Sequence, residues 1–566
     1  MTVAHELALR GECEVTVYEL RATAGGKARS IDGVSAAPPG LSHVPGEHGF
    51  RFVPGFYRHL PDTMARIPLA GSRDRVVDNL VEATDTLIAQ DGDQPPLIAP
   101  NQAPGASWLD GIKQARSFAR ATELTISDQL HFLWVLLRLM SASPRRRFRS
   151  YEQQSWWDFS NAERRTRAYR EFLADGLTRS LVAAKAREIS ARTGGYILLQ
   201  LLAESSRPSA PADRVLNGPT STVWIDPWLD ELRRLGVRFE LGHRVEELVS
   251  DRSGVTGVAG HQVSWEGGTP TQGAQFEDQA DLFVAAVPVE VIRDQLDLGN
   301  LPSRSPELRN LGSLTSRWMN GIQFYLREDV PIVRGHAIYI DSPWALTSVS
   351  QRQFWPSVDF SHFGEGRIGG VLSVDVSDWD ARGAHVAADK PARDCTQQEI
   401  AEEVWAQLKQ ALNHPVPVLE DENLVSWFVD PDIVAPNPGH ATRESMNLEP
   451  LLINTKGSWD ARPNASLSGG LRLYLAADYV RTYTDLATME AANEAARRAV
   501  NAILDATGSA APRCPVWPLV ETGGRLFAVI RAIDALVFRL TPSSSATRSP
   551  IRARVARPAG ASSSAR

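Results

Sequence analysis

Residues 14–30, EVTVYELRATAGGKARS, decide how this sequence is interpreted. The segment Glu14–Glu19 has the composition of a short buried strand that ends in an acid. It follows Thr2–Arg10, whose composition favours a helix, with Gly11 placed to stop it. A helix that leads into a strand is the latter part of a βαβ unit, so we predict an α/β fold.

The acid that ends this strand predicts a nucleotide site. In dinucleotide-binding folds a carboxylate at this place accepts hydrogen bonds from the adenosine ribose hydroxyls. The same fold uses a GxGxxG turn about 20 residues earlier, where a helix N-terminus meets the pyrophosphate. Counting back from Glu19 places that turn before Met1. An ordinary acid at the end of a strand is the alternative interpretation of Glu19.

The glycine pair that follows strengthens the nucleotide interpretation. Gly25 and Gly26 come six and seven residues after Glu19. A tight turn there would bring backbone N–H groups, together with the cation of Lys27, to the same phosphates. A simple surface turn is the alternative.

At this point the sequence resembles a known family. Glu19 and Gly25–Ser30 are similar to the second FAD motif of the flavin amine oxidase and phytoene desaturase superfamily, and the Gly-Gly-Lys form resembles its carotenoid desaturase branch. Gly46–Phe52, followed by Gly55–Tyr57, resembles the next block of that branch, which lies close to the flavin. The resemblance implies that His48 and Tyr57 contact the cofactor.

The resemblance returns in the second half of the chain. Val245 is similar to a residue of the family's strand on the adenine side of the cofactor. Ala280–Pro288 is similar to the segment in which the family's chain re-enters the FAD domain. Leu475–Thr482 and Thr488–Ala492 resemble the C-terminal flavin motif. The resemblance implies that Asp478 meets the ribityl–phosphate region and that the helix starting near Met489 points at the flavin. Two departures are Ala477 and Ala492, where the family often has glycine.

The resemblance implies FAD as the cofactor and a discontinuous Rossmann-type FAD-binding domain with a mixed, helix-rich substrate domain. We expect three segments of the FAD-binding domain, at 1–60, 217–300 and 465–510, the first without its initial strand and phosphate loop. We expect the substrate domain in two segments, a helix-rich one at 61–216 and a second at 301–464. A C-terminal helix at 511–540 and a disordered basic tail at 541–566 would complete the chain. The absent phosphate loop leaves two alternatives, a start that lies upstream or a fragment with impaired FAD binding.

Several segments of the expected substrate domain carry further signals. Thr125–Met140 and Asn161–Glu204 have helix-like patterns, and Gln397–Leu412 is a clear helix. Five aromatic residues could line a tunnel for a long hydrocarbon or could simply pack in the core: Trp156, Trp157, Trp344, Phe354 and Trp355.

One segment has the character of a membrane-docking surface. Leu130–Met140 is apolar and precedes the cationic Arg145–Arg149, the combination that such a surface requires. A buried helix followed by a solvated turn is the alternative. For Leu526–Leu540, which is apolar and interrupted by arginines, we expect a helix that packs on the protein itself.

Composition excludes several other classes of protein. The 566 residues are 43% hydrophobic, with 60 Lys+Arg against 67 Asp+Glu and a net charge of −7, which argues against disorder and against a nucleic-acid partner. The 3 cysteines form no CxxC, and the 12 histidines show no HxH or HxxxH spacing, so we expect no metal site. With no long apolar run, we expect a cytoplasmic protein, with a membrane surface as a candidate partner.

We therefore expect an FAD-dependent oxidoreductase that acts on an apolar isoprenoid in a carotenoid- or squalene-type desaturation or a related redox step. His48 and Arg51 are the candidate catalytic residues, from their place in the motif; the expected cofactor-binding residues are Glu19, Gly25, Gly26, Lys27, His48, Tyr57, Val245, Asp478 and Met489. An amine or amino-acid oxidase, and a truncated flavoprotein without activity, are the alternatives. The sequence leaves the electron acceptor open.

Overall fold

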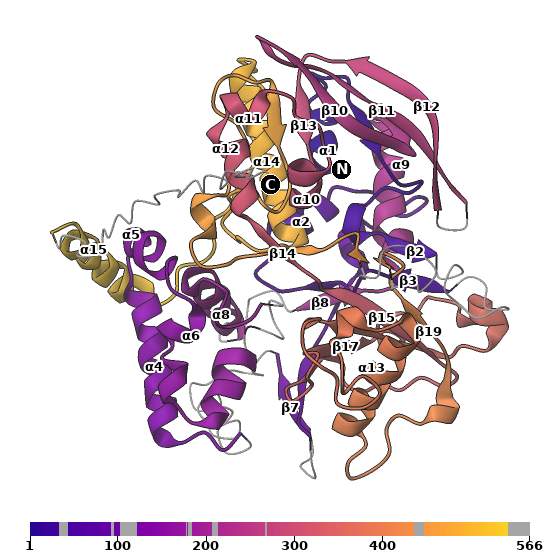
Figure 1. The fold of residues 1–566 in the computed structure, drawn as a ribbon, viewed down its shortest axis with the longest axis vertical. Helices are drawn as coiled ribbons and strands as arrows, with labels where there is room; N and C mark the ends of the chain where they lie inside the picture. The colour runs from indigo at the N-terminus through magenta and orange to yellow at the C-terminus, as the bar shows by residue number, and fades with distance from the viewer. Residues whose placement is uncertain are drawn as a thin grey trace, which may run out of the picture.

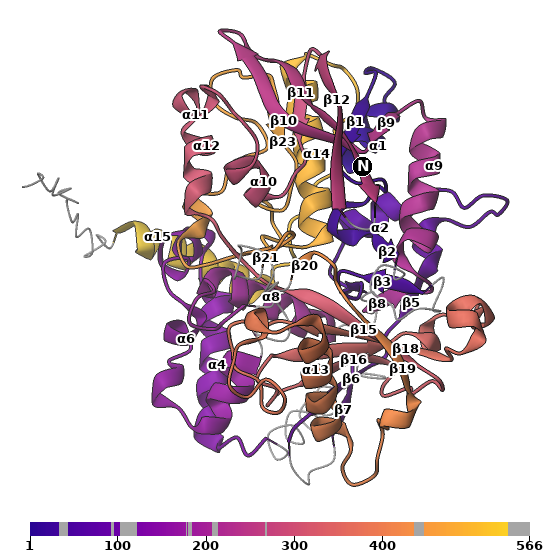
Figure 2. The ribbon, with the colours of Figure 1, turned by 45° about the vertical axis from the view of Figure 1, so that its right-hand side comes forward.

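The computed structural model describes residues 1–32, 44–91, 96–101, 122–176, 178, 184–205, 213–266, 269–434 and 446–540. Three parts are visible in Figures 1 and 2: an α/β part that contains the N-terminus, a large mixed sheet, and a lobe of helices. The predicted basic tail at 541–566 lies outside the described residues.

The α/β part contains two pairs of parallel strands. β1 (Thr16–Glu19) pairs with β9 (Arg238–Leu241), and β13 (Phe283–Ala285) pairs with β23 (Leu473–Leu475). Each pair joins segments that lie far apart in the sequence, so this part of the fold is discontinuous. An antiparallel sheet of three strands stands beside the pairs; it consists of β10 (His243–Asp251), β11 (Gly254–Glu266) and β12 (Thr269–Gln279).

Helices surround the two pairs. They are α1 (Thr2–Ala8), α2 (His59–Met64), α9 (Asp226–Arg234), α10 (Val289–Asp294), α11 (Leu301–Arg304), α12 (Pro306–Asn310) and α14 (Met489–Ala506). Glu490, in the first turn of α14, fixes that helix to the start of α2. Its carboxylate accepts hydrogen bonds from the backbone N–H groups of Arg58, His59 and Leu60, each 2.8 Å long.

The mixed sheet has seven strands. Their order is β19 (Leu424–Val429), β15 (Asn320–Leu326), β18 (Gly370–Val376), β17 (Leu346–Ser350), β16 (Gly335–Tyr339), β6 (Asp85–Ala89) and β7 (Leu97–Pro100). Because β6 pairs with β16, residues from 61–216 and from 301–464 share one sheet. Helix α13 (Gln397–Leu412) packs on one face of it through a common apolar core.

The helical lobe is built around a separate core. It contains α4 (Ile126–Ser141), α5 (Pro144–Arg146), α6 (Trp156–Phe159), α8 (Ala191–Ser205) and α15 (Gly524–Leu540). Short strands connect the three parts; they are β2 (Ser30–Asp32), β3 (Pro45–Glu47), β4 (Phe52–Val53), β5 (Leu80–Glu82), β8 (Arg214–Leu216), β14 (Thr315–Arg317), β20 (Ile433–Val434), β21 (Met446–Asn447) and β22 (Leu451–Ile453).

One sequence-based expectation differs from the structure, and another agrees with it in part. Asn161–Glu204 is not one helical region, because Asn161 has a left-handed backbone (φ 53°) and the backbone of Ile189 and Ser190 bridges to other segments before α8 begins. The helix expected at Leu526–Leu540 forms as α15 and packs against α4 and α5 as expected, but none of its residues is fully buried, so one side of the helix stays exposed.

The aromatic residues considered for a tunnel pack in the cores instead. Trp156 and Trp157 belong to the helical lobe, Trp344 to the core under α13, and Phe354 and Trp355 to a core beside the mixed sheet. None of them lines the large pocket described below. Among the helices of the described ranges, no helix combines the length and the apolar character needed to cross a bilayer.

Candidate functional site

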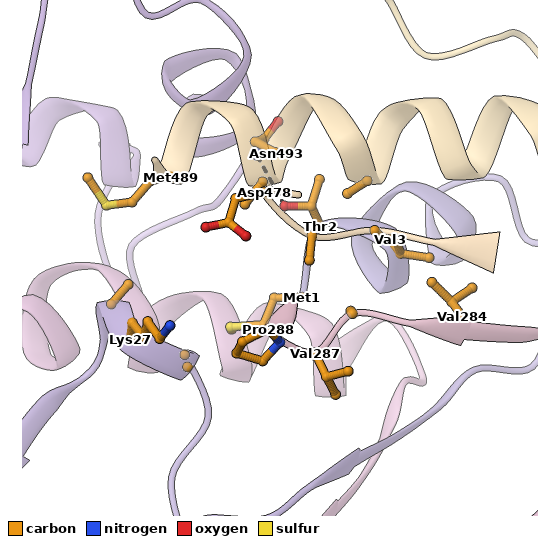
Figure 3. Close-up of a pocket in the computed structure, with 18 of the residues that line it drawn as sticks. Met1, Thr2, Val3, Lys27, Val284, Val287, Pro288, Asp478, Met489 and Asn493 are labelled. Carbon is orange, nitrogen blue, oxygen red and sulfur yellow. Dashed lines mark hydrogen bonds between the residues drawn. The ribbon is translucent and has the colours of Figure 1, made fainter. Parts of the chain in front are cut away.

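A pocket of about 1310 Å³ lies between the two parallel strand pairs. Strands β1 and β13 both line it, together with the beginnings of α1 and α14 (Figure 3). The pocket brings together every residue that the sequence nominates for the site: Glu19, Gly25, Gly26, Lys27, His48, Arg51, Tyr57, Val245, Asp478 and Met489. The function of each of these residues stays a prediction, but one pocket now contains them all.

Glu19 lies at the C-terminal end of β1, where its carboxylate enters the pocket. Oε1 accepts a hydrogen bond of 2.9 Å from the backbone N–H of Arg21. Burial raises the pKa of Glu19, while that hydrogen bond and the charge of Arg29 oppose the rise. In the described part of the chain no hydrogen bond reaches Oε2, which leaves it available to a hydroxyl group of a ligand.

The glycine turn follows in an open part of the wall. Gly25 and Gly26 have φ of 115° and 56°, a backbone region that favours glycine. A Cβ atom on Gly26 would have no atom within 4 Å, so a ligand can approach the backbone there. The ammonium group of Lys27 is turned away, because its Nζ donates to Oε1 of Glu290 (3.0 Å) and to the carbonyl of Pro450.

The C-terminal motif forms the wall shown at the top of Figure 3. Asp478 points its carboxylate into the pocket, and no described residue donates a hydrogen bond to that carboxylate. Thr488 caps α14, since its side chain accepts a hydrogen bond of 3.1 Å from the N–H of Ala491. Met489 begins this helix of 18 residues, and its N-terminus opens on the pocket.

These groups fit FAD. A carboxylate at a strand end suits a ribose, an open glycine turn suits the pyrophosphate, and a free carboxylate near a helix N-terminus suits the hydroxyl-rich ribityl chain. The positive end of a helix also stabilises negative charge on a reduced flavin ring. The pocket volume, about 1310 Å³, exceeds the roughly 300–1,000 Å³ of common small-molecule sites, as a large cofactor with a substrate requires.

His48 forms a buried pair with an aspartate that the sequence does not nominate. Its Nδ1 lies 2.5 Å from Oδ2 of Asp430, which also accepts a hydrogen bond of 2.9 Å from Nδ2 of Asn320. Burial acts to raise the pKa of Asp430, but hydrogen bonds from His48 and the backbone outweigh it, so the pKa is lowered. Nε2 of His48 is buried without a hydrogen-bond partner, and the residue lines the pocket.

A third acid completes a cluster with the donor types of a metal site, namely His48, Asp430 and Asp432. Arginines already compensate Asp432: Arg21 Nη2 lies 2.6 Å and Arg29 Nη2 3.3 Å from its carboxylate oxygens. Two fixed guanidinium groups would repel a cation. We therefore interpret the cluster as an ion-pair network that holds His48 in place.

Arg51 makes hydrogen bonds chiefly to backbone carbonyls. Nη1 donates to Gly49 (2.7 Å) and Nη2 to Lys27 (2.8 Å). Because these bonds join the glycine turn to the block around His48, the structure favours a positioning role for Arg51.

The pocket continues toward the mixed sheet and the helical lobe. The sheet contributes His336, Thr347 and Asp375, and the lobe contributes apolar residues that include Ile197 and Leu201 of α8. Burial lowers the pKa of His336 to about 4, so this imidazole is neutral at neutral pH. This end of the pocket is therefore mostly apolar, with few polar groups.

Sequence reasoning missed two acids of this site. Asp375 and Asp430 belong to no motif that we recognised, and both lie far along the chain from His48. A weak signal existed for Asp375, which is the one acid in the apolar strand Gly370–Val376. No comparable signal marks Asp430, whose relation to His48 comes from the tertiary fold.

Comparison with known proteins agrees with this geometry. Residues 1–504 match the family model described as flavin containing amine oxidoreductase. No curated protein sequence gives a significant match.

Solved structures with the same fold include three oxidoreductases, each 12% identical to this chain. An oxidoreductase from Methanosarcina mazei has a TM-score of 0.53 and covers 89% of this chain and 97% of its own. Cyclohexylamine oxidase from Brevibacterium oxydans has a TM-score of 0.54, with coverage of 90% and 97%. Putrescine oxidase bound to putrescine has a TM-score of 0.55, with coverage of 89% and 96%. At this identity the likeness establishes the fold alone: a Rossmann-type FAD domain with a substrate domain.

Proposed function

The chain belongs to the flavin-containing amine oxidoreductase family and is an FAD-dependent oxidoreductase, and we propose that its substrate is an apolar isoprenoid taken from a membrane surface. The reaction would be a desaturation of a carotenoid- or squalene-type hydrocarbon or a related redox step. The resemblance of Gly25–Lys27 to the desaturase branch supports this choice.

An exposed apolar surface on the helical lobe carries the proposal. Helices α4 and α15 contact each other and lie at the outer side of the lobe (Figures 1 and 2). Their exposed apolar side chains, which we call the α4–α15 surface, are Ile126, Leu130, Leu133, Trp134, Leu137, Leu526, Val529, Ile533, Leu536, Val537 and Leu540. Proteins that stay in water seldom expose so many large apolar side chains together.

Polar contacts attach one side of α15 to the lobe and leave the apolar side chains on its other side exposed. Nη2 of Arg146 lies 2.6 Å from Oδ1 of Asp534, whose Oδ2 accepts a hydrogen bond of 2.8 Å from the N–H of Ser143. Arg531 donates to the carbonyl of Met140 (3.0 Å). Because these contacts attach one side of the helix to α4 and α5, the exposed apolar side chains on its other side are available to a lipid phase.

Cations accompany the apolar side chains. Arg145, Arg149, Arg525 and Arg539 are exposed and form no ion pair with any described residue. Anionic lipid headgroups attract such side chains by about 1 kcal/mol each. An apolar surface with unpaired arginines suits the interface of an anionic membrane.

Helix α8 connects this surface to the pocket. It packs against α4 in the core of the lobe, and its residues Ile197 and Leu201 line the pocket. Apolar side chains of α8 therefore lie between α4 and the pocket, which favours an apolar over a hydrated substrate.

When bound, FAD supplies the two-electron oxidation, and the chain supplies binding, orientation and proton transfer. Glu19 and Asp478 would hold the cofactor through its hydroxyl groups, and Arg51 fixes the glycine turn to the block around His48. The apolar residues of α8 would exclude water from the reacting carbon atoms. His48, with its free Nε2 and with Nδ1 beside the carboxylate of Asp430, remains a candidate for proton transfer.

Oxidation of an amine is the second candidate. Asp375 places a buried carboxyl group in the pocket without an ion-pair partner among the described residues, and an ammonium group could pair with it. The named functions of cyclohexylamine oxidase and putrescine oxidase support this alternative by fold analogy only.

Anaerobic flavin reduction tests the proposal. The protein is incubated with FAD, desalted and mixed without oxygen with a squalene- or carotenoid-type hydrocarbon in anionic liposomes, or with cyclohexylamine or putrescine. We expect the oxidised-flavin absorbance to fall with the hydrocarbon and to remain with the amines. The reverse pattern would establish amine oxidation, and a colourless desalted protein would support the inactive alternative.

A further inference from the structure

We propose that Asp375 takes up the proton that the substrate loses during oxidation. The inference rests on the FAD-dependent oxidation proposed above, but it applies to a carbon–carbon or a carbon–nitrogen bond.

The strand directs Asp375 to the pocket. Along β18, Leu372, Val374 and Val376 belong to the core shared with α13, and successive residues of a strand point to opposite faces. Asp375 therefore faces away from α13, and it lines the pocket together with Thr347, its register partner on β17. The acid is thus presented by a central strand of a seven-stranded sheet, which holds it rigidly.

A glycine makes room for this carboxyl group. A Cβ atom on Gly49 would lie 2.7 Å from Oδ1 of Asp375, so a side chain at position 49 would displace the acid. Gly49 directly follows His48, and the backbone N–H of Phe50 hydrogen-bonds the Asp375 carboxyl group. The acid therefore lies against the block that forms the flavin-side wall.

Few hydrogen bonds and no ion pair with a described residue stabilise the buried carboxyl group of Asp375. Asp375 is only 7% exposed, and its Oδ1 is buried without a hydrogen-bond partner. No described cation lies within ion-pair distance of it. A structural acid in a core would be paired or fully hydrogen-bonded, so this unsatisfied oxygen, in a pocket that a substrate must enter, indicates a functional group.

Its protonation state suits proton transfer at neutral pH. Burial raises the pKa of Asp375 to about 7. The nearby Arg51 and His48 oppose this rise in pKa, and the negative charge of Glu47 adds to it. A general base works best when its pKa lies near the working pH.

The step balances as a dehydrogenation. Bound oxidised FAD would supply the two-electron acceptor for the hydrogen that leaves the substrate carbon with both electrons of its C–H bond. The neighbouring C–H or N–H bond gives its proton to the Asp375 carboxylate, and the electron pair left behind forms the new C=C or C=N bond. The substrate thus loses two hydrogens and two electrons, and Asp375 becomes a neutral carboxylic acid.

Infrared spectroscopy tests the proton site without turnover. The FAD-loaded protein is titrated from about pH 5 to about pH 9, and the carbonyl stretch of protonated carboxylic acids is followed. We expect a band that disappears with a midpoint near 7, that is absent from Asp375→Asn, and that persists in Ser373→Ala. Ser373 is a matched control because it is a buried residue of the same strand that does not line the pocket. A titration that is unchanged in Asp375→Asn would overturn the proposal.

Rapid kinetics tests the catalytic role. Anaerobic flavin reduction should rise with pH through the same midpoint in the wild type, slow by about 10²–10⁴-fold in Asp375→Asn, and recover partly in Asp375→Glu. Reduction of Asp375→Asn within about twofold of the wild-type rate would overturn the assignment. If the hydrocarbon does not reduce the flavin of the wild-type protein, the proposed substrate is contradicted instead. The wild type and Asp375→Asn are then compared with the amine as substrate. The infrared result does not depend on the substrate.

Discussion

Single acidic residues at or near the ends of strands line this pocket. Glu19 ends β1, Asp375 lies near the end of β18, and Asp478 follows β23. The sequence allowed Glu19 and Asp478 to be predicted, because each belongs to a local motif with fixed spacing. Asp375 and Asp430 could not be predicted in this way, since only the folded sheet brings them to His48.

Replacing Glu19 should weaken FAD binding. In Glu19→Gln the amide cannot accept from a ribose hydroxyl as strongly as the carboxylate does, and loss of a charged hydrogen bond costs about 1.4 kcal/mol, a tenfold rise in Kd. Fluorescence titration with FAD measures the change. Glu240→Gln on the neighbouring strand β9 is the control, because Glu240 does not line the pocket. Equal affinities of wild type and Glu19→Gln would contradict the assigned role.

Asp375 should also reduce stability at high pH. Its folded pKa is raised to about 7 from 3.8, so the unfolded chain releases this proton at lower pH than the folded one. Stability is therefore lost as pH rises between these values, and the cost reaches about 4 kcal/mol above pH 7. Asp375→Asn removes this cost and should raise the melting temperature more at about pH 8 than at about pH 5. A pH-independent difference, as expected for Ser373→Ala, would show that Asp375 does not titrate in this range.

At the scale of elements, regular amphipathic segments could be predicted from the sequence. The contacts that interrupt a helix or leave one of its sides exposed could not. α13 begins and ends at the predicted residues, since Thr396 caps it and its apolar periodicity is strong. The region 161–204 departs from prediction, because backbone bridges at Ile189 and Ser190 interrupt a helix-like composition. α15 forms where expected and packs against α4 and α5, but the composition did not indicate that the other side of the helix stays exposed.

The α4–α15 surface should bind anionic membranes. In a flotation assay the wild-type protein should rise with vesicles that contain anionic lipid, and less with neutral vesicles or at high salt. Leu133→Glu or Ile533→Glu should reduce binding at least tenfold, since a buried leucine-sized side chain contributes about 1.5–3 kcal/mol. Val416→Glu is a matched control, because Val416 is 65% exposed but lies outside this surface. If both surface variants floated with the vesicles to the same extent as the wild type, the proposal would be contradicted.

At the scale of the whole molecule, three parts of the chain meet at one pocket. The α/β part contributes the motifs predicted to bind the nucleotide, the mixed sheet contributes Asp375, and the helical lobe contributes α8. The α4–α15 surface lies on the outer side of that lobe. Motif order along the sequence predicted the family and its cofactor. The substrate was not predictable in the same way, because it depends on how the lobe and the sheet close the pocket.

The most direct test of the account is the mass of a hydrocarbon after one anaerobic turnover. FAD-loaded protein is mixed with a squalene- or carotenoid-type hydrocarbon in anionic liposomes, and the extracted lipid is analysed by mass spectrometry. We predict a product that lacks two hydrogens, formed in proportion to the flavin reduced. An unchanged hydrocarbon, together with conversion of an amine by the same preparation, would contradict the account.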